Sequence, residues 1–364
     1  MRFAKAIVKL LKMSAPDKLR DFALRIPKVE LHVHLEGTMQ PATLLRLAKR
    51  RGVELPAGDE AGLHDWFRFR DFDHFVNVYL TCSKCVKEPE DFQTLVRDFM
   101  AEQARQNVRY SEVHFTIATH VQFGRNAQEI AHALWEAMEE GEKRHGVRMR
   151  LIPDMVRDVG PKWGEVTLRW AVENRGRGVV ALGLTGREAI HDNEPFRAHF
   201  RQAAQEGLHC VAHAGEHAGP ASVRSALDVA RAERIGHGVR SIEDPGLIAE
   251  LVRRRVPLEV CVTSNVCLGV APTVGEHPVD RLRRAGVALS INSDDPPMFN
   301  TTLSEEYFRL HEAFGYDAET LGRFALAALE QSFLPAAEKD RLGGEFRGEI
   351  AALGGEILGR PLAV

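Results

Sequence analysis

Short apolar runs alternate along the chain with longer stretches in which apolar residues recur at helical spacing. The short runs are typical of buried parallel strands, and the longer stretches are typical of amphipathic helices. This alternation predicts a parallel sheet with crossover helices. The expected strands are 29–33, 109–115, 148–156, 178–184, 208–213, 234–237, 256–262 and 286–291. The clearest helices between them are 127–144, 163–175, 195–206, 221–232 and 245–255.

Eight strand–helix units in a chain of 364 residues predict a closed (β/α)8 TIM barrel rather than an open, doubly wound sheet. The spacing is uneven, because about 75 residues separate the first two expected strands. In this segment between the first two strands, residues 40–51 are expected to form one helix and residues 63–96 an inserted helical lid. Residues 302–353 are expected to form extra helices that close the C-terminal end.

The lid segment is rich in aromatic residues. Phe67, Phe69, Phe72 and Phe75 recur at roughly helical spacing, so most of them are expected in the core. No linker, repeat or low-complexity segment divides residues 1–364, which predicts a single domain. The basic segment 1–25 is expected to be a leading amphipathic helix rather than a signal peptide, because lysines interrupt its apolar run.

Composition narrows the function classes. The chain is 44% hydrophobic and 27% charged, with a formal net charge of -3, as in a soluble globular protein with an ample core. No polybasic character indicates a nucleic-acid or membrane partner. Five cysteines, an odd number, and no secretory signal predict a cytoplasmic protein with free thiols. Cys82 and Cys85 form a CxxC in a helical pattern without a second pair, which favours packing over metal or redox use.

Candidate chemistry begins at the end of the first strand, in VELHVHLEG. His32 and His34 are two residues apart, so in an extended strand both side chains point to the same face. Two imidazoles on one face can bind one metal ion. Alone, such a pair is more often two packed or exposed histidines.

Other strand ends supply the remaining ligands. Barrel active sites lie at the C-terminal ends of the strands. The fifth strand ends at His213, and the eighth is followed by Asp294. Together with His32 and His34 they form an N/O ligand set that suits Zn²⁺ first, with Fe²⁺ or Mn²⁺ as alternatives. The fourth strand carries no lysine to bridge two metals, which favours a single ion.

Further polar residues lie at the same end of the barrel. Glu216, three residues after His213, is placed to shuttle a proton between water and substrate. His237, between two glycines, is placed either to accept the proton of the water or to hold hydroxide by charge. Asp295 faces away from its neighbour Asp294 in extended geometry, so it is expected to serve the substrate. The backbone N–H of Gly186 is available to a flat ligand.

These stretches resemble the adenosine deaminase family. The matching segments are LHVHLEGTM, LGLTGREA, VAHAGEHAGP, RIGHGVR, VCVTSNVCLG and SINSDDPPMF, in the order typical of the family. The resemblance implies a barrel hydrolase that replaces the 6-amino group of a purine by oxygen and releases ammonia. It implies one Zn²⁺ on His32, His34, His213 and Asp294.

The resemblance also implies roles for individual residues. Glu216 would protonate purine N1, and His237 would orient and activate hydroxide. Asp295 would hydrogen-bond N7, and Gly186 would meet N3. The expected partners are therefore a small purine substrate and water.

Specificity rests on departures from the typical family pattern. Glu36 stands where typical adenosine deaminases have an aspartate that binds the ribose 5′-hydroxyl. FRFRDFDHF and NSDDPPMFNTTLSEEY look most like the bacterial subgroup that deaminates aminodeoxyfutalosine, a nucleoside with a benzoate-bearing 5′ arm. Arg68 and Arg70 in the lid are candidates for binding that carboxylate. Both are equally well explained as exposed helix arginines or as partners of Asp71 or Asp73.

The leading expectation is deamination of adenosine or aminodeoxyfutalosine, and free adenine is the alternative substrate. A relative that binds purines without turnover is disfavoured by the presence of Glu216, His237 and Asp295 together. A phosphotriesterase-like or dihydroorotase-like hydrolase is disfavoured because the bridging lysine is missing.

Overall fold

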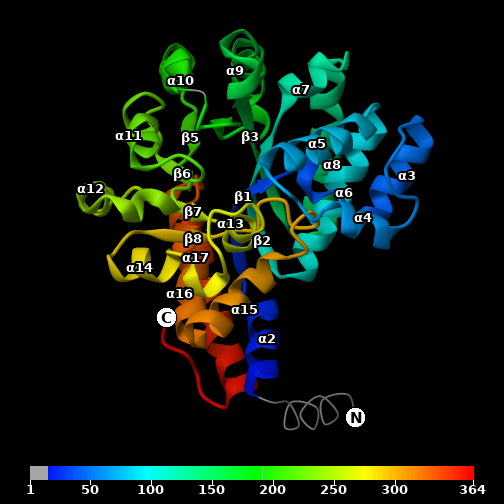
Figure 1. Ribbon diagram of the computed structural model, residues 1–364. Helices are drawn as coiled ribbons and strands as arrows, with labels where there is room; N and C mark the ends of the chain where they lie inside the picture. The colour runs from blue at the N-terminus through cyan, green and yellow to red at the C-terminus, as the bar shows by residue number, and fades with distance from the viewer. Residues whose placement is uncertain (1–14, 191) are drawn as a thin grey trace.

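Eight parallel strands form the centre of the protein in a computed structural model that describes residues 15–190 and 192–364. The strands pair in chain order from β1 to β8 (Figure 1). The barrel closes where His34 N–H donates to Asp294 C=O at 2.9 Å and Asp294 N–H donates to His32 C=O at 3.1 Å. The strands are β1 (Lys28–His34), β2 (Val108–Phe115), β3 (Arg148–Val156), β4 (Ala181–Thr185), β5 (His209–Ala214), β6 (Arg234–His237), β7 (Leu258–Val260) and β8 (Leu289–Ile291).

Each expected strand is present, but three of them are shorter than the apolar runs suggest. β4 and β8 begin three residues after Gly178 and Gly286, whose φ values of 122° and 83° belong to turns rather than strands. β7 ends at Val260 because helix α13 starts at Val262. Apolar turn residues that pack beneath the sheet have the same composition as strand residues, so hydrophobicity alone extends the prediction too far.

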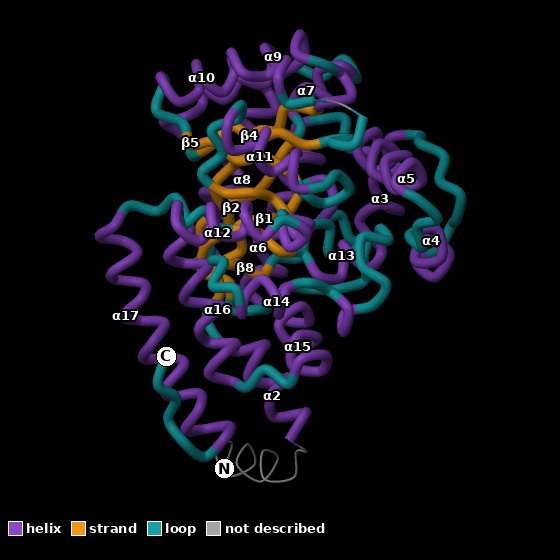
Figure 2. Tube along the Cα trace, turned by 60° about the vertical axis from the view of Figure 1, so that its left-hand side comes forward, coloured by secondary structure: helices purple, strands orange, loops and turns teal. Residues whose placement is uncertain are grey.

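Helices surround the barrel on its outer face (Figures 1 and 2). The five predicted crossover helices are present within a few residues of their expected bounds. They are α8 (Ala127–His145), α9 (Pro161–Asn174), α10 (Arg197–Gln205), α11 (Pro220–Asp228) and α12 (Pro245–Arg254). Three short helices were not predicted: α7 (Ile117–Gln122), α13 (Val262–Cys267) and α14 (Val279–Arg284).

The insertion after β1 is helical, as expected, and gathers beside one rim of the barrel (Figure 1). It consists of α3 (Pro41–Arg51), α4 (Glu60–Trp66), α5 (Phe72–Cys85) and α6 (Pro89–Arg105). Phe67 is buried, but Phe72 and Phe75 are only partly buried and line a cavity. Phe69 and Phe75 are partly buried and pack against the core, so the expectation of a core position was wrong only for Phe72. The apolar face of α5 covers the barrel mouth.

The extra C-terminal helices are α15 (Leu303–Phe314), α16 (Ala318–Gln331) and α17 (Ala336–Leu353). α16 packs along β8 and β1, while α15 packs against α2 (Ala15–Arg25) and α17 against α16 (Figures 1 and 2). Lys28 is fully buried and its ammonium donates to three carbonyls, of Ala23, Leu24 and Ile26. This lysine caps the last turn of α2 and fixes it to β1. The rest of the expected leading segment, residues 1–14, lies outside the described residues.

The inside of the barrel carries buried charge below the strand ends. Arg234 is about 1% exposed, and its guanidinium lies between the carboxylates of Glu112 and Glu259. It also stacks on the Phe333 ring at 3.8 Å. Paired in this way, a buried cation is compensated by both neighbouring carboxylates.

No helix among residues 15–190 and 192–364 is long and apolar enough to span a membrane. All five cysteines are free, and Cys82 and Cys85 are buried in α5. Burial raises the pKa of Cys85 to about 11. Packing, as the sequence indicated, is the arrangement that the structure gives these two thiols.

Candidate active site

The strand ends bring the four predicted metal ligands together. His32 and His34 lie at the end of β1, His213 lies near the end of β5, and Asp294 follows β8. All four are buried, with exposed fractions of 6% or less. His34 Nε2 lies 3.1 Å from His213 Nε2 and 3.3 Å from Asp294 Oδ1, and His32 Nε2 lies 3.6 Å from that same oxygen.

These distances fit one small metal ion. Ligand atoms about 2.0–2.1 Å from a tetrahedral ion are about 3.3 Å apart, close to the separations found here. His32 Nε2 is buried without any hydrogen-bond partner among the described residues. A cation between these atoms would satisfy this nitrogen and would remove the repulsion between facing lone pairs. The described residues therefore fit a metal centre.

His32 and His213 are oriented by a hydrogen-bond acceptor at their other ring nitrogen, whereas His34 has a carboxylate at longer range. His32 Nδ1 lies 2.9 Å from Glu259 Oε2, and His213 Nδ1 donates to Leu184 C=O at 3.1 Å. His34 Nδ1 lies 3.7 Å from Asp154. With Nδ1 bound to an acceptor, the Nε2 lone pair is left for the metal.

The fourth ligand, Asp294, is also oriented by a hydrogen bond to its other carboxylate oxygen. Ser264 donates its hydroxyl to Asp294 Oδ2 at 2.6 Å, which leaves Oδ1 facing His32 and His34. Burial lowers the pKa of His32, but Asp294 and Glu259 raise it by more, to about 9. The surrounding carboxylates thus favour positive charge at this point.

Asp294 and His237 both adopt positive φ, of 64° and 60°, a backbone strain that is common at functional sites.

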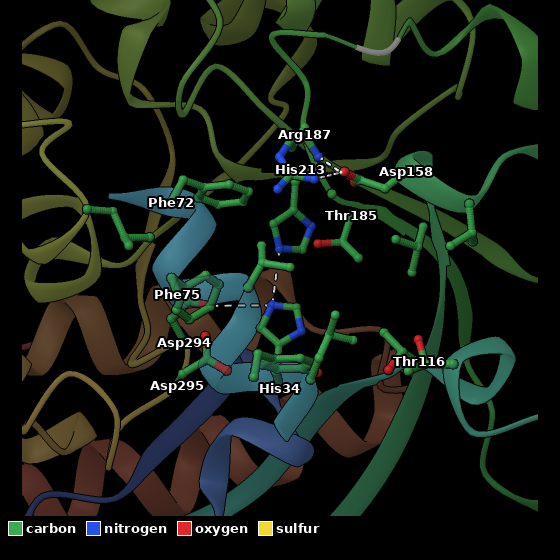
Figure 3. Close-up of a pocket in the computed structure, with 18 of the residues that line it drawn as sticks. His34, Phe72, Phe75, Thr116, Asp158, Thr185, Arg187, His213, Asp294 and Asp295 are labelled. Carbon is green, nitrogen blue, oxygen red and sulfur yellow. Dashed lines mark hydrogen bonds and ion pairs between the residues drawn. The ribbon is translucent and has the colours of Figure 1, made fainter. Parts of the chain in front are cut away.

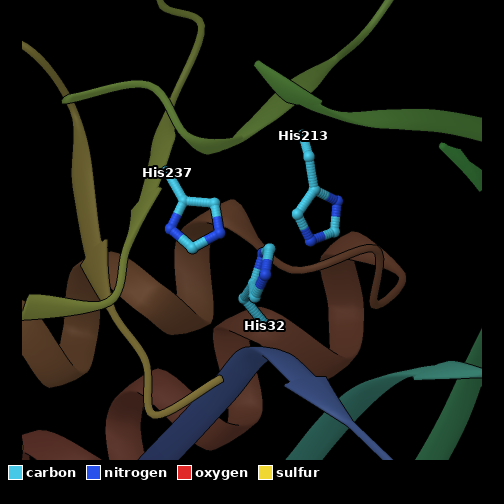
Figure 4. A group of neighbouring side chains, drawn as sticks. All are labelled: His32, His213 and His237. Carbon is cyan, nitrogen blue, oxygen red and sulfur yellow. The ribbon is translucent and has the colours of Figure 1, made fainter. Parts of the chain in front are cut away.

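Glu216 and His237 lie beside the four ligands. His237 Nε2 is 3.8 Å from Glu216 Oε1 and 3.9 Å from Asp294 Oδ2. Figure 4 shows the rings of His32, His213 and His237 turned toward one another. Burial raises the pKa of Glu216, but His237 and the hydrogen bond from His217 outweigh it, so the net pKa is below the ordinary value. Glu216 is therefore a carboxylate that can take up a proton.

A chain of hydrogen bonds defines which nitrogen of His237 carries the proton. The backbone N–H of Val279 donates to His277 Nδ1 at 3.1 Å, so His277 carries its proton on Nε2. That N–H donates to Asn265 Oδ1 at 3.0 Å, which turns the Asn265 amide nitrogen toward His237 Nδ1 at 3.2 Å. His237 Nδ1 accepts, so His237 Nε2 carries the proton and faces Glu216 and Asp294.

Asp295 is buried beside the metal-binding atoms, and its Oδ1 has no hydrogen-bond partner among the described residues. Burial and the charge of Asp294 raise its pKa well above the ordinary range. Gly37 makes room for it, because a Cβ on Gly37 would lie 1.6 Å from Asp295 Oδ1. Asp295 is thus directed into the site by a glycine in the first motif.

A cavity of about 360 Å³ opens above the metal-binding residues. Its floor includes His34, His213 and Asp294, and Glu216, His237 and Asp295 also line it. Figure 3 shows Phe72 and Phe75 on one side of His34 and His213, with Thr116 and Thr185 on the other. Gly186 lines the same wall as Thr185. Apart from Glu36, Arg68 and Arg70, the predicted site residues lie around this cavity or, in the case of His32, directly beside a residue that lines it.

Helix α5 forms the roof of the cavity. Six of its residues, one helical face, line the cavity: Phe72, Phe75, Val76, Tyr79, Leu80 and Lys84. Phe75 stacks on Phe299 with ring centres 5.6 Å apart, and Tyr79 donates its hydroxyl to Glu36 at 3.0 Å. These contacts fix the roof to the segments that follow β8 and β1.

Glu36 does not reach the cavity as the resemblance implied. It is fully buried, and one oxygen accepts from Thr116 N–H and Oγ–H and from His120, while the other accepts from Tyr79. With full burial and four protein donors, the Glu36 carboxylate is used within the protein and does not line the cavity. Its longer side chain instead joins β1, β2 and α5.

Arg68 and Arg70 also lie outside the cavity. Both are exposed, and Arg68 pairs with Asp65 at 3.5 Å. The cations that line the cavity are Lys84 and Arg187. Arg187 is held by Asp73 and Asp158, whereas Lys84 has no ion-pair partner in the described part of the chain. Arg68 precedes α5, whereas Lys84 lies on the helical face of α5 that lines the cavity.

Several supporting residues were not predicted from the sequence. They are Gly37, Asp154, Glu188, Glu259, Ser264, Asn265 and His277. Most lie on strands or loops that carry no predicted ligand, and they act through a neighbour. Ser264 and Asn265 fall within VCVTSNVCLG, which carried the resemblance, so that motif was the available signal.

Comparisons with known proteins agree with this geometry. The adenosine deaminase family model matches residues 27–347. An aminodeoxyfutalosine deaminase of Streptomyces coelicolor is 39% identical over 345 residues, covering 94% of this chain and 89% of the relative. An adenine deaminase of the same organism is 37% identical over 332 residues, covering 91% and 97%.

Structural comparison gives the same result. The crystal structure of an amidohydrolase from Burkhoderia ambifaria with bound Zn has a TM-score of 0.87 and 25% identity, covering 96% of each chain. Fold, sequence and site agree, and the chain belongs to the adenosine deaminase family, the hydrolases that act on the C–N bond of an amino-substituted ring.

Proposed function

We propose that the protein deaminates the 6-amino group of an adenine nucleoside, either adenosine or 6-amino-6-deoxyfutalosine. The observation that supports a nucleoside is the extent of the cavity, which runs from His34 and Asp294 out to Lys84 and Arg187. Its volume of about 360 Å³ lies in the range that holds larger ligands than a single flat base. Free adenine is the alternative substrate, since relatives with that activity are nearly as similar.

The proposed cofactor is one Zn²⁺ held by His32, His34, His213 and Asp294. The three imidazole nitrogens and one carboxylate suit zinc, and they also accept Fe²⁺ or Mn²⁺. When bound, the metal supplies a Lewis acid that lowers the pKa of water beside it. Metal analysis of protein purified without added metal identifies the native ion.

The reaction adds water oxygen to C6 of the purine and breaks the bond from C6 to the amino nitrogen. Glu216 takes one proton from the attacking water and passes it to N1. The second proton leaves with the amino group as ammonia, and the 6-oxo product remains. His237, whose Nε2 carries a proton, holds the water by donating to it rather than by taking its proton.

Two further residues are proposed to orient the purine base. Asp295 is proposed to hydrogen-bond N7, and the backbone N–H of Gly186 to meet N3. Both line the cavity together with Glu216. Contacts along two edges of the base would hold C6 against the metal-binding floor, which is how positioning lowers the barrier.

The outer cavity is proposed to hold the arm of the nucleoside. Lys84 lies beside the Phe123 ring, with Nζ 5.9 Å from its centre, and both line the cavity. An aromatic arm can pack on Phe123, and a carboxylate on it can pair with Lys84. Lys84 replaces Arg68 and Arg70 as the residue proposed to select a carboxylate.

Kinetics on three substrates test this proposal. We expect kcat/KM to be higher on aminodeoxyfutalosine or adenosine than on adenine. The reaction is measured as the loss of absorbance of the adenine ring. Lys84→Ala should lower kcat/KM on aminodeoxyfutalosine by about tenfold and leave adenosine unchanged. Arg68→Ala, an exposed lid cation outside the cavity, is the matched control. A preference for adenine would assign the free-base activity instead.

Glu216→Gln tests the mechanism. Removing the proton carrier should lower kcat by about a hundredfold or more while the metal stays bound. Wild-type turnover by a metal-replete variant would contradict the proposed role.

A further inference from the structure

One carboxylate binds almost every backbone donor of the turn that carries Glu216. Glu188, three residues after β4, accepts from the backbone N–H groups of residues 215, 216, 217 and 218 at 2.8, 2.7, 2.5 and 2.9 Å. It also accepts from the Ser222 hydroxyl at 2.6 Å. Consecutive N–H groups that converge in this way form an anion-binding nest, here filled by a side chain of the same protein.

The carbonyl side of the same turn is held separately. Arg157 is buried, and its guanidinium donates to His213 C=O at 2.7 Å and to Gly186 C=O at 3.2 Å. Arg157 therefore fixes the start of the turn, and Glu188 fixes its N–H groups. Gly215, with φ of 68°, allows the chain to reverse between them.

Glu188 is not among the residues that line the cavity, so it cannot touch a substrate there. Within the described residues, the Glu216 carboxylate lies 3.2 Å from His217 Nδ1 and 3.8 Å from His237 Nε2. The first is a single hydrogen bond from a partly exposed ring, and the second is longer than a hydrogen bond, so these contacts alone do not hold the carboxylate rigidly. The position of Glu216 is thus determined mainly by its backbone, and that backbone is bound to Glu188.

We propose that Glu188 is a positioning residue that holds the turn 215–218 so that the Glu216 carboxylate faces C6 and N1 of the substrate. This inference rests on the proposed role of Glu216. Without the carboxylate, four N–H groups would lose a charged acceptor and the turn would populate other conformations. The reaction would then slow because the proton carrier spends less time in the productive position.

Glu188→Gln tests the proposal, because the amide keeps the size of the side chain but presents only one acceptor oxygen. We expect kcat to fall by about tenfold or more, with KM changed by less than about twofold and full metal content. Hydrogen exchange of the amides at 215–218 should become faster, while amides of the β strands keep their rates. Glu194→Gln, an exposed carboxylate in the same connection paired with Arg197, is the matched control.

A double variant separates positioning from a general structural effect. In the Glu216→Gln background, Glu188→Gln should cause little further loss of kcat, because both changes act on the same step. Multiplied losses, or unchanged exchange at 215–218, would overturn the proposal. If Glu188→Gln does not fold, Ser222→Ala replaces it, because it removes one donor to Glu188. It should lower kcat and speed amide exchange at 215–218 by smaller factors. If Ser222→Ala shows neither effect, the proposal is also overturned.

The exchange measurement does not depend on turnover. If wild-type protein releases no ammonia from any of the three substrates, the proposed function fails. Faster exchange at 215–218 in Glu188→Gln would then still show that Glu188 holds the turn.

Discussion

At three positions of the predicted motifs only glycine fits, because a neighbouring functional side chain occupies the space that a Cβ atom on the glycine would need. A Cβ on Gly37 would meet Asp295 Oδ1 at 1.6 Å, and one on Gly183 would meet Asp154 Oδ1 at 1.9 Å. A Cβ on Gly236 would lie 2.8 Å from His32. These contacts are far shorter than van der Waals separations, so each glycine defines the place of a functional or orienting side chain.

Gly37→Ala should therefore inactivate the enzyme without unfolding it. The new methyl group must displace the Asp295 carboxylate, and misplacement by about an ångström can cost about a hundredfold in rate. Steady-state kinetics and metal analysis on the same sample check this. Gly58→Ala, where nothing lies within 4 Å of the added Cβ, is the control. Normal kcat/KM in Gly37→Ala would show that Asp295 does not need its present position.

Asn265→Asp tests the protonation state of His237. The aspartate oxygen would accept from His237 Nδ1 instead of donating to it, which moves the ring proton away from the water. We expect kcat to fall by about tenfold or more with the metal retained. Asn126→Asp, where the side chain only accepts from the first turn of α8, is the control. A wild-type kcat in Asn265→Asp would contradict the donor role of His237.

At the scale of elements, α5 combines two tasks on one helix. Its apolar face covers the cavity. Near its start Asp73 pairs with Arg187, and at its middle Tyr79 donates to Glu36, so two contacts attach it to the barrel. Phe72 packs edge-on against His217, next to Glu216, with ring centres 4.8 Å apart. The roof is therefore connected to both β1 and the turn that follows β5.

Tyr79→Phe should loosen this roof. It removes one of the donors to the buried Glu36 carboxylate, at a cost of about 1–3 kcal/mol in the free energy of unfolding. We expect a higher KM, faster amide exchange in α5 and little change in kcat. Thr81→Ala, whose hydroxyl donates only within α5, is the control. Equal stability and KM in Tyr79→Phe and wild type would show that the contact with Glu36 does not hold the lid.

At the scale of the whole molecule, buried ionisable groups couple stability to pH. Burial lowers the pKa of His277 to about 3, and the charge of His237 adds to the effect. In the unfolded chain, a histidine has a pKa of about 6.5. Between these values the unfolded state binds a proton that the folded state does not, so this group lowers stability as pH falls from about 6.5 to 3.

His277→Gln should reduce that loss. Glutamine can donate to Asn265 as His277 does, but it has no proton to gain in this range. Urea unfolding of both proteins at several pH values between 8 and 4 measures the difference. We expect the gap in unfolding free energy between the two proteins to change in favour of the variant as pH falls below about 6.5. A constant gap across the range would contradict the role of His277.

The sequence by itself determined the barrel and the centre of the site. Alternating apolar strands and amphipathic helices define a parallel barrel, and all strand ends of such a barrel meet at one rim. That rule alone brings His32, His34, His213 and Asp294 together, because β-strand periodicity sets the direction of each side chain. Glu216, His237 and Asp295 followed from their places just beyond the same ends.

Only the tertiary structure decided which residues act through others and which face the substrate. Glu36 looked like a substrate ligand but is bound by donors from β2, α5 and α7, which are distant in sequence. Arg68 and Lys84 are both cations of the insertion, and the orientation of α5 on the barrel places Lys84 alone at the cavity. Glu188 meets the turn at 215–218 only because β4 and β5 are neighbours. The sequence pattern within one strand or helix specifies which face each side chain is on. Which residues of different elements touch depends on how those elements pack.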